Sequence, residues 1–520
     1  MAGSGETWVS RGSDFVIKGN SRWVGMNDGG YLPIRLSIQN SGATRNLTVQ
    51  FSSPPGYLKQ PTVRRSIQVE QNETARFTLL VPVVTLGNGG QFQVLYNGKE
   101  FKKHTKNISL KNYDLNTSSY PALLVISSQH VDFFDFDKAI NPSASIGPGA
   151  YGYAVNLEEQ RLAIEPTLLP ESWLAYSGVD IVAVPLKTLT KMRRDARTAL
   201  LQWVETGGTL IVYNVGEDFT KSEQLADGLE LKSHQHISQQ WTSNNNVFSN
   251  FSHRFYHQGM IISFQDDSLF TMKKVGKEGF DARGRAKATS EWNYVLNTIT
   301  PQRYSWRQRH GVSPRTMSDD FLKFHIPGVQ GVPVYSFLFL ITIFTIVIGP
   351  LNYFFFWRRK QLYLLIITIP IIAFMTSLSL FGYSIVAHGW GVKSRVRSVT
   401  FLDQQNNTAV STARVALFAG MVPSGGLQFS PRTAVYPLWK TTDEFSSGTV
   451  NWSENQSFTT GWLRSRTHTQ FLLTEHRTER GRLNIKNNAD GKLSIENGLE
   501  WDIEAIVVID EQGNVFSGKD

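Results

Sequence analysis

Two pairs of histidines form the densest group of metal-binding residue types in the sequence. His234 and His236 would point to one face of a strand, and His253 and His257 would share one face of a helix. Metal sites are often built from such pairs. No acidic residue at a suitable spacing completes a ligand set, however, and the neighbouring Gln and Asn residues indicate a polar loop. We therefore expect no metal and no other cofactor, and keep the four histidines as candidate ligands only.

Three aspartates follow the continuous apolar run 122–126. If this run is a strand of an open α/β sheet, Asp132, Asp135 and Asp137 lie near its carboxyl edge, where such sheets bind ligands. Paired carboxylates could act in acid–base catalysis or bind a cation. The alternative is that the intervening Phe residues pack while the acids face solvent. Ser127 at the same edge lacks the Gly-x-Ser-x-Gly turn of a hydrolase. We treat these four residues as ligand-binding candidates and predict no catalytic residue.

The composition excludes other classes of chemistry. The 520 residues include no cysteine, so the chain has no disulfide, no thiolate nucleophile and no Cys-ligated metal. The formal net charge of +9 is scattered along the chain and not gathered into a basic run interleaved with aromatic residues. We therefore predict no binding to nucleic acid.

The first part of the chain, residues 1–112, shows the alternation of apolar and polar residues that is typical of half-buried strands. The alternating runs are 34–38, 47–51, 75–81 and 92–96, and Gly- and Pro-rich turn sequences separate them. This spacing predicts an immunoglobulin-like β-sandwich.

Residues 118–300 predict an α/β domain. The runs Ile181–Val184 and Leu210–Tyr213 are apolar without interruption, which indicates a sheet covered on both faces. Between them, Thr190–Thr206 has the apolar stripe of an amphipathic helix, which Gly207 and Gly208 terminate. This order of strand, helix and strand is a βαβ unit, and Met260–Phe264 predicts a further strand.

Two long apolar stretches follow a juxtamembrane segment at 301–332. Val334–Trp357 and Leu362–Ala387 contain no charged residue, and each exceeds the roughly 20 residues that a helix needs to cross a bilayer. Buried core helices are the alternative, but helices of soluble proteins keep a polar face. We predict a transmembrane helical hairpin at 333–388. The segment that follows, 394–520, returns to alternation and predicts a C-terminal all-β domain, which we expect to continue beyond Asp520.

Helix-breaking residues interrupt both apolar stretches. Gly349 and Pro350 in the first, and Pro370 in the second, are candidates for a membrane hinge, because proline removes a backbone hydrogen bond and kinks a helix. A static kink is the alternative. Asn352 is placed to form an interhelical hydrogen bond.

The loop between the two stretches predicts topology. Arg358, Arg359 and Lys360 concentrate positive charge in a short loop, which places that loop in the cytoplasm and both large domains outside it. Lys393, Arg395 and Arg397 dilute this asymmetry, so the opposite orientation stays the second hypothesis. Because Met1–Thr7 resembles no export signal, we expect an export element upstream of the recorded start or absent from this chain.

Particular sequences resemble known families. Ser172–Leu174, Val179–Val182 and Trp203–Leu210 resemble the signature of the class I glutamine amidotransferase-like (flavodoxin-like) domain of bacterial envelope proteins. Ile348–Tyr353, with its Gly-Pro-Leu-Asn-Tyr motif, and Thr368–Pro370 are similar to the hairpin of a family of uncharacterised bacterial membrane proteins. Those proteins place such a domain before the hairpin and a β domain after it. The resemblance covers most of the chain and implies no established activity.

One departure from the resemblance bears on function. Amidotransferases of this fold use a Cys activated by a His, and this chain has no Cys. The resemblance therefore implies the scaffold without its chemistry, as in Cys-less domains of auxiliary components of gliding-type ABC transport systems. We expect a non-catalytic protein of the bacterial inner membrane with extracytoplasmic domains. It would act in protein interaction or scaffolding, as part of a transport or envelope-biogenesis assembly. Its partners would be the lipid bilayer and other membrane or envelope proteins. A hydrolase or a ligand sensor at the α/β carboxyl edge is the alternative.

The predicted topology can be tested by thiol labelling. Since the chain lacks cysteine, Gln361→Cys and Ser446→Cys each create a single thiol. In intact cells, a membrane-impermeant thiol reagent should label the Ser446→Cys variant and leave Gln361→Cys unlabelled. Labelling of Gln361→Cys with protection of Ser446→Cys would establish the opposite orientation.

Overall fold

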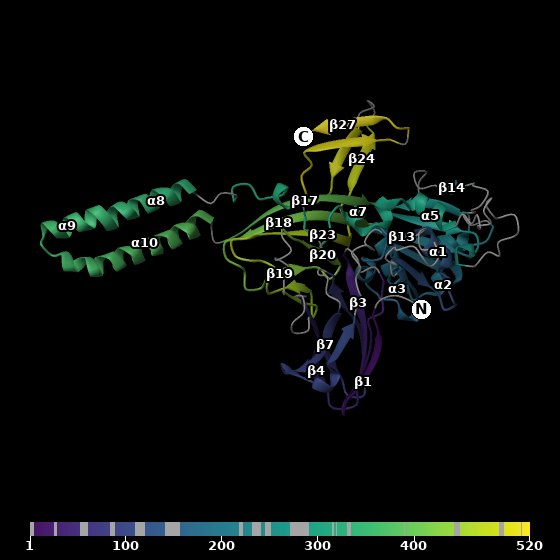
Figure 1. Ribbon diagram of the computed structural model, residues 1–520. Helices are drawn as coiled ribbons and strands as arrows, with labels where there is room; N and C mark the ends of the chain where they lie inside the picture. The colour runs from purple at the N-terminus through teal and green to yellow at the C-terminus, as the bar shows by residue number, and fades with distance from the viewer. Residues whose placement is uncertain are drawn as a thin grey trace, which may run out of the picture.

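The chain folds into several β-sheets, from which two long apolar helices project (Figure 1). The computed structural model describes residues 5–24, 29–52, 61–83, 89–109, 120–140, 157–217, 222–230, 241–244, 251–270, 291–314, 317–318, 320–329, 334–388, 391–440, 448–487, 493–510 and 512–519.

The N-terminal region forms a β-sandwich. One sheet has the order β1-β2-β3-β6, and the second is built around β5-β4-β7, with β8 and β9 beside β7. Alternate residues point inward, as in β4, where Leu47, Val49 and Phe51 are fully buried. The strands are β1 (Thr7–Arg11), β2 (Phe15–Asn20), β3 (Tyr31–Asn40), β4 (Arg45–Ser52), β5 (Thr62–Val69), β6 (Thr74–Pro82), β7 (Gly89–Tyr96), β8 (Lys99–Glu100) and β9 (Lys106–Ser109).

The second sheet of the sandwich continues into the C-terminal part of the chain. β21 (Thr449–Asn451) lies parallel to β5, and β22 (Gln456–Phe458) and β19 (Leu427–Phe429) extend the sheet beyond it. The added strands pair the backbone groups that the edge of β5 would otherwise expose. The two ends of the chain therefore share one sheet, which local alternation does not predict.

The middle region is a mainly parallel sheet in the order β11-β10-β12-β13-β16-β15-β14. Pairing is parallel from β11 to β16, and β15 and β14 are antiparallel additions. The predicted apolar runs are confirmed as its central strands. The strands are β10 (Leu123–Ile126), β11 (Arg161–Ile164), β12 (Ile181–Pro185), β13 (Thr209–Tyr213), β14 (Thr242–Asn244), β15 (Phe251–Tyr256) and β16 (Gly259–Phe264).

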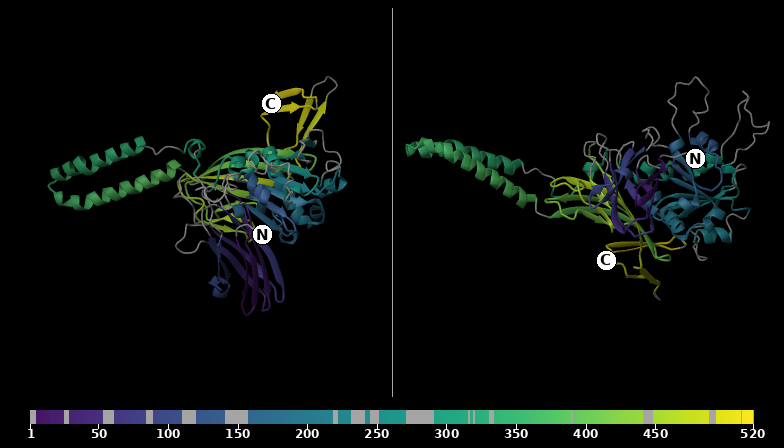
Figure 2. Two further views of the ribbon diagram at one scale, coloured as in Figure 1. Left: turned by 45° about the vertical axis from the view of Figure 1, so that its right-hand side comes forward. Right: turned by 90° about the horizontal axis from the view of Figure 1, so that it is seen from below.

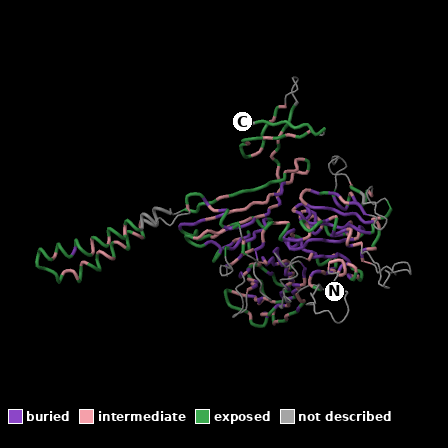
Figure 3. The backbone as a smooth tube through the Cα atoms, turned by 45° about the horizontal axis from the view of Figure 1, so that its top comes forward, coloured by how far each residue is buried: buried purple, intermediate pink, exposed green. Residues whose placement is uncertain are grey.

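Helices cover both faces of this sheet, as its uninterrupted apolar strands predict, and the sheet lies in the most deeply buried part of the body (Figure 3). Phe136 and Trp292 pack on one face, and Leu200 and Trp203 on the other. The helices are α1 (Phe134–Ile140), α2 (Leu186–Lys191), α3 (Arg194–Glu205), α4 (Glu223–Gly228), α5 (Glu291–Ile299), α6 (Pro301–Tyr304) and α7 (Trp306–His310).

The amphipathic helix predicted at Thr190–Thr206 is α3, which begins at Arg194, and Thr190 and Lys191 are the last residues of α2. Met192 and Arg193 have extended backbone, which ends α2 and begins α3. Met192 is buried, so the break carries an apolar side chain into the core. The periodicity of apolar residues predicted the buried face of the helix correctly, but it did not predict the break at Met192 and Arg193.

The C-terminal region forms a further sheet in the order β17-β18-β23-β20. These strands run from the base of the helical pair into the body (Figure 2). Two separate hairpins, β24-β25 and β26-β27, complete the region. The strands are β17 (Val392–Asp403), β18 (Thr408–Ala419), β20 (Thr433–Leu438), β23 (His468–Thr478), β24 (Leu483–Asn487), β25 (Leu493–Asn497), β26 (Ala505–Ile509) and β27 (Val515–Lys519).

The two apolar stretches are confirmed as helices long and apolar enough to cross a membrane, at Leu338–Arg358 and Leu362–Gly382. They are 6% and 0% buried, which excludes the alternative of core helices. The first comprises α8 (Val334–Ile346), a π-helical turn (Val347–Leu351) and α9 (Asn352–Arg358), and the second is α10 (Leu365–His388) after a short 3-10 turn (Leu362–Leu364).

The hairpin carries an internal polar contact. Asn352 donates from Nδ2 to Thr368 Oγ1 at 3.0 Å, which confirms the predicted interhelical hydrogen bond. Pro350 lies with Gly349 in the π-helical turn, as expected where proline interrupts the ladder of backbone bonds, and Pro370 lies within α10. Their role as a hinge stays a prediction.

Stability should depend strongly on Trp203, which is 2% exposed and packs against Tyr176. Truncating a buried aromatic side chain costs about 3–5 kcal/mol. We expect Trp203→Ala to lower the free energy of unfolding of the full chain by this amount, whereas Lys187→Ala on the exposed side of α2 should be nearly neutral. Urea unfolding in mild detergent measures both. Indistinguishable midpoints would contradict the packing described.

Candidate functional site

A cavity opens at the carboxyl edge of the parallel sheet, where β10 ends. Its volume is about 680 Å³, within the usual range of ligand sites. Ser127, Asp132 and Asp137, which the sequence analysis selected, are among the residues that line it. Asp135, on α1, is not among the lining residues. The remaining lining residues include His130, Phe133, Phe134, Glu158, Arg161 and Glu165.

The charges in this cavity are partly matched to one another. Arg161 Nε lies 2.6 Å from Asp137 Oδ1, and the Arg161 guanidinium stacks over the Phe133 ring at 4.8 Å from its centroid. Burial raises the pKa of Asp137, and the Arg161 charge offsets part of that rise. Asp132 accepts the Phe134 N–H at 2.9 Å and thereby fixes the start of α1. Asp137 is therefore partly buried and paired, whereas the hydrogen bond that Asp132 accepts is exposed to solvent.

The hydroxyl of Ser127 is occupied by local structure. Its Oγ accepts the Gln129 N–H at 3.0 Å. It also contacts Tyr213, whose pKa burial raises to about 12 while the Ser127 hydrogen bond opposes the rise. Within the described residues, no histidine forms a hydrogen bond to this hydroxyl, so a nucleophile activated by a base is not assembled here.

The histidines are placed differently from the sequence-based expectation. His253 lies on β15 and His257 in the turn before β16, so the helix that would align them does not form. Local alternation of buried residues along β15 overrides the four-residue spacing. His234 and His236 lie outside the described residues. In the part of the chain that the structure describes, no group of three or more His, Asp or Glu side chains could hold a metal ion.

His257 instead belongs to a cluster that joins the α/β domain to the C-terminal sheet, which we term the interdomain clasp (Glu205, His257, Asp403 and His476). His257 Nε2 lies 3.4 Å from Asp403 Oδ2 and 3.9 Å from Glu205 Oε1. His476 Nε2 forms a very short contact with Glu205 Oε2. The Glu205 and His476 side chains are 9% and 5% exposed, so this contact is shielded from solvent.

The groups around the clasp tune its charge. Burial, followed by the nearby Glu205 charge, raises the pKa of the Tyr256 hydroxyl and keeps it neutral. The pKa of Asp403 is lowered, because hydrogen bonds from Asn406 and Gln405 and the nearby His257 outweigh the effect of its burial. Asp403 is therefore a fixed negative group beside His257.

The clasp and the cavity lie at opposite edges of the sheet. Asp132 follows the end of β10, whereas His257 precedes the start of β16, and these strands run in the same direction through β12 and β13. About five residues of strand, roughly 16 Å, separate the two edges. Asp132 and His257, two of the residues that the hydrolase alternative would combine, are therefore not brought together, and His130 is the histidine that lines the cavity.

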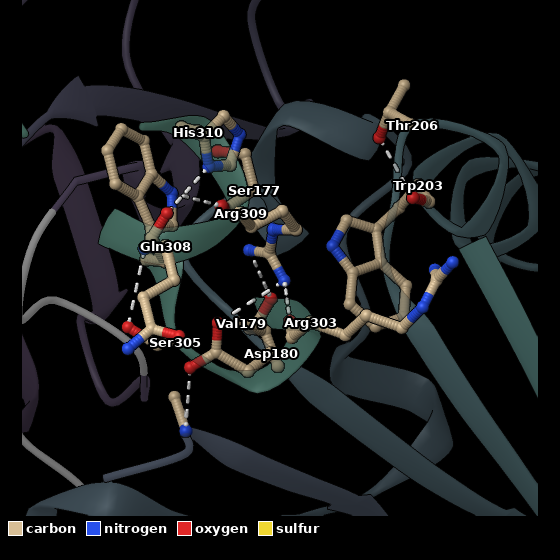
Figure 4. A network of polar contacts seen from close by, with 12 residues as sticks. Ser177, Val179, Asp180, Trp203, Thr206, Arg303, Ser305, Gln308, Arg309 and His310 are labelled. Atoms are coloured by element: carbon tan, nitrogen blue, oxygen red, sulfur yellow. Dashed lines mark hydrogen bonds and ion pairs between the residues drawn. The ribbon is translucent and has the colours of Figure 1, made fainter. Parts of the chain in front are cut away.

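A second polar network fixes the amino edge of β12. Arg309 Nη1 lies 3.3 Å from Asp180 Oδ1, and Asp180 Oδ2 accepts the Ala122 N–H at 2.9 Å (Figure 4). Arg309 also donates to the carbonyls of Arg303 and Val179. Next to it, burial lowers the pKa of His310 to about 3, and the Arg309 charge contributes to this shift. The imidazole is neutral, stacked on Trp306.

Sequence reasoning missed Glu205, Asp403 and His476, because their partners are far apart in the chain. Of these three residues, only Glu205 could have been noticed from the sequence. It occupies the last turn of α3, where the negative end of the helix dipole disfavours an acid, so its presence there indicates a compensating partner.

Comparisons with known proteins add no family. No family model and no curated protein matches this chain. Among solved structures, a calcium-binding mutant of Bacteroides uniformis β-glucuronidase 2 has 14% identity and a TM-score of 0.14, over 41% of this chain and 25% of that chain. A Paenibacillus sp. cycloisomaltooligosaccharide glucanotransferase complexed with cycloisomaltoheptaose has 11% identity and a TM-score of 0.17, over 52% of this chain and 35% of that chain. Similarity this low carries no argument about function.

Removing one member of the clasp should lower the stability of the protein. His476→Ala leaves the Glu205 carboxylate buried without its nearest partner, which typically costs about 3–5 kcal/mol. We expect a loss of this size in urea unfolding of the full chain. The double variant Glu205→Leu/His476→Leu should lose less, because neither member is left unpaired. Lys323→Ala, which breaks the exposed pair with Asp320, is the control and should be nearly neutral. A His476→Ala variant as stable as the control would show that the clasp contributes little.

Proposed function

We propose that this chain is a non-catalytic membrane-anchored envelope protein that acts in protein interaction or scaffolding. Its parallel sheet is the amidotransferase-like (flavodoxin-like) domain without its nucleophile, its sandwich is immunoglobulin-like, and the helical hairpin anchors both in the bacterial inner membrane with the large domains extracytoplasmic. An auxiliary subunit of a transport or envelope-biogenesis assembly has these properties.

One observation carries the proposal: the two edges of the α/β sheet are used differently. The clasp covers the amino edge with the C-terminal sheet, whereas the carboxyl edge keeps an open cavity. At the rim of that cavity the Phe134 side chain is 54% exposed. A large exposed aromatic beside a concave surface is typical of a site that binds another protein.

The non-enzymatic interpretation is consistent with how the described side chains of the cavity are engaged. The cavity offers carboxylates, His130 and one paired guanidinium, and its serine hydroxyl accepts a hydrogen bond from the backbone of Gln129. Acid–base catalysis needs its groups within hydrogen-bond reach of one reacting atom. His257 lies at the other edge and is engaged by Glu205 and Asp403.

A ligand sensor is the second candidate. The volume of the cavity suits a small molecule, and its carboxylates would accept hydrogen bonds from a cationic or polyhydroxylated ligand. A sensor would transmit binding through β10 and its neighbours to the interdomain clasp. This candidate and the scaffold role use the same edge and differ in the occupant of the cavity.

Site-specific photocross-linking tests the scaffold role. A photoreactive phenylalanine analogue at Phe134 should give a discrete adduct of higher mass in native membranes, because that ring lies at the proposed binding edge. The same analogue at Val9, which is 55% exposed on β1 of the sandwich, is the matched control and should give no such adduct.

Two outcomes would contradict the proposal. The first is the same adduct pattern at both positions. The second is release of ammonia from glutamine by the purified full chain, with the activity lost in Asp135→Asn or His257→Ala. A small molecule that protects Phe134 from cross-linking and is retained on purification would favour the sensor.

A further inference from the structure

Three segments of the C-terminal region are tied together where α10 leaves the hairpin. Gly391 lies three residues beyond the end of α10, and its carbonyl accepts the Gly420 N–H at 3.1 Å. Gly420 in turn accepts the Ser465 hydroxyl at 2.6 Å, and Arg466 N donates to the Ala419 carbonyl at 2.7 Å. These bonds place the turn after β18 and the start of β23 at the level of the hairpin exit.

That level corresponds to the border of the apolar span. The apolar stretch Leu362–Ala387 ends with α10, and the Arg466 guanidinium lies 5.9 Å from the centroid of the Phe381 ring, about two turns before the end of that helix. Arg466 has φ +57°, which is uncommon for a residue other than glycine. This guanidinium therefore lies beside the last turns of α10, close to where the chain leaves the apolar stretch.

The side chains presented at this level combine apolar and basic groups. Met421 and Val422, in the turn after β18, are 52% and 38% exposed. Lys393, Arg464 and Arg466 are also exposed. Lys393 lies on β17 opposite Phe418, so it is close to the same turn. Exposed apolar tips beside cations are typical of surfaces that lie on a bilayer, where the tips enter the acyl boundary and the cations remain among phosphates.

We propose that these residues form a bilayer-contact surface (Lys393, Met421, Val422, Arg464 and Arg466) that binds the phosphate groups of anionic phospholipids. Met421 and Val422 enter the lipid, and the three cations contact headgroups beside α10. This surface fixes the tilt of the body on its hairpin, because it adds a second attachment to the membrane. It does not depend on the proposed scaffold role.

Depth-dependent quenching tests the contact. Because the chain lacks cysteine, Met421→Cys carries one fluorescent label, and Val9→Cys, with a similar exposure, is the matched control. In nanodiscs of phosphatidylcholine and phosphatidylglycerol, spin-labelled lipid should quench the label at 421 and leave the label at 9 unchanged. Equal fluorescence at 421 with and without spin-labelled lipid would overturn the proposal.

Lipid retention tests the headgroup chemistry. Each cation near an anionic surface contributes roughly fivefold to binding. In native mass spectrometry of the full chain from mixed phosphatidylcholine and phosphatidylglycerol micelles, Lys393→Gln/Arg464→Gln/Arg466→Gln should lower phosphatidylglycerol retention on the order of tenfold or more. The triple variant Lys99→Gln/Lys102→Gln/Lys103→Gln, exposed on the sandwich, should retain it as the unmodified chain does.

Further arms separate a folding defect and a free-anion site from lipid binding. Arg466→Lys keeps the charge and should keep retention, and an unchanged urea midpoint for the triple variant shows that it is folded. Millimolar inorganic phosphate should not displace the lipid. Undiminished retention in a folded triple variant, or displacement by phosphate, would contradict a headgroup site.

Discussion

One short segment, Trp173–Asp180, forms hydrogen bonds with the sandwich, with α7 and with the C-terminal region. The indole N–H of Trp23, from the sandwich, donates to Ala175, and that of Trp306 donates to Ser177, each at 3.0 Å. From the same segment, Trp173 donates to the carbonyl of Arg432 in the C-terminal region at 3.0 Å. A buried carbonyl without a donor costs stability, and indole supplies a donor together with a large apolar surface. Three parts of the chain therefore have to meet at this segment.

The charged contacts follow from that meeting. When the domains are packed together, Asp180 forms an ion pair with Arg309, and Glu205 contacts His476. Both contacts lie beside the amino edge of the parallel sheet. A buried charge is tolerated only when a partner is fixed nearby, so these pairs specify one arrangement of the domains more than they add stability. The carboxyl edge is left open. The cavity with Asp132, Asp137 and Phe134 stays open because the domain contacts cover the other edge of the sheet.

Local patterns allowed much of the fold to be predicted. The alternation in β4, the uninterrupted apolar runs of β12 and β13 and the two uncharged stretches of the hairpin are local sequence features, and the structure contains the elements that they predict. The position of Asp132 and Asp137 at a strand end also followed from the sequence, because the carboxyl edge is set by chain direction.

Long-range pairing could not be predicted in this way. The addition of β21 to β5 joins residues almost four hundred positions apart, and the hydrogen bond from Gln456 to Tyr31 spans 425 residues. The spacing of His253 and His257 suggested a shared helical face, but burial on β15 decided the local structure. Acidic partners for His257 came from Glu205 and Asp403, on other elements. Periodicity reports which residues are buried and not which distant segment covers them.

We infer that the contacts at Trp173–Asp180 make the sandwich and the α/β domain one rigid body. Pulsed electron paramagnetic resonance on the full chain in nanodiscs tests it most directly, because Glu73→Cys on the sandwich and Lys187→Cys on α2 would be the only thiols. The account predicts a single narrow distance distribution between the two spin labels, broadened in the Trp23→Ala variant. A broad distribution in the otherwise unmodified chain would contradict it.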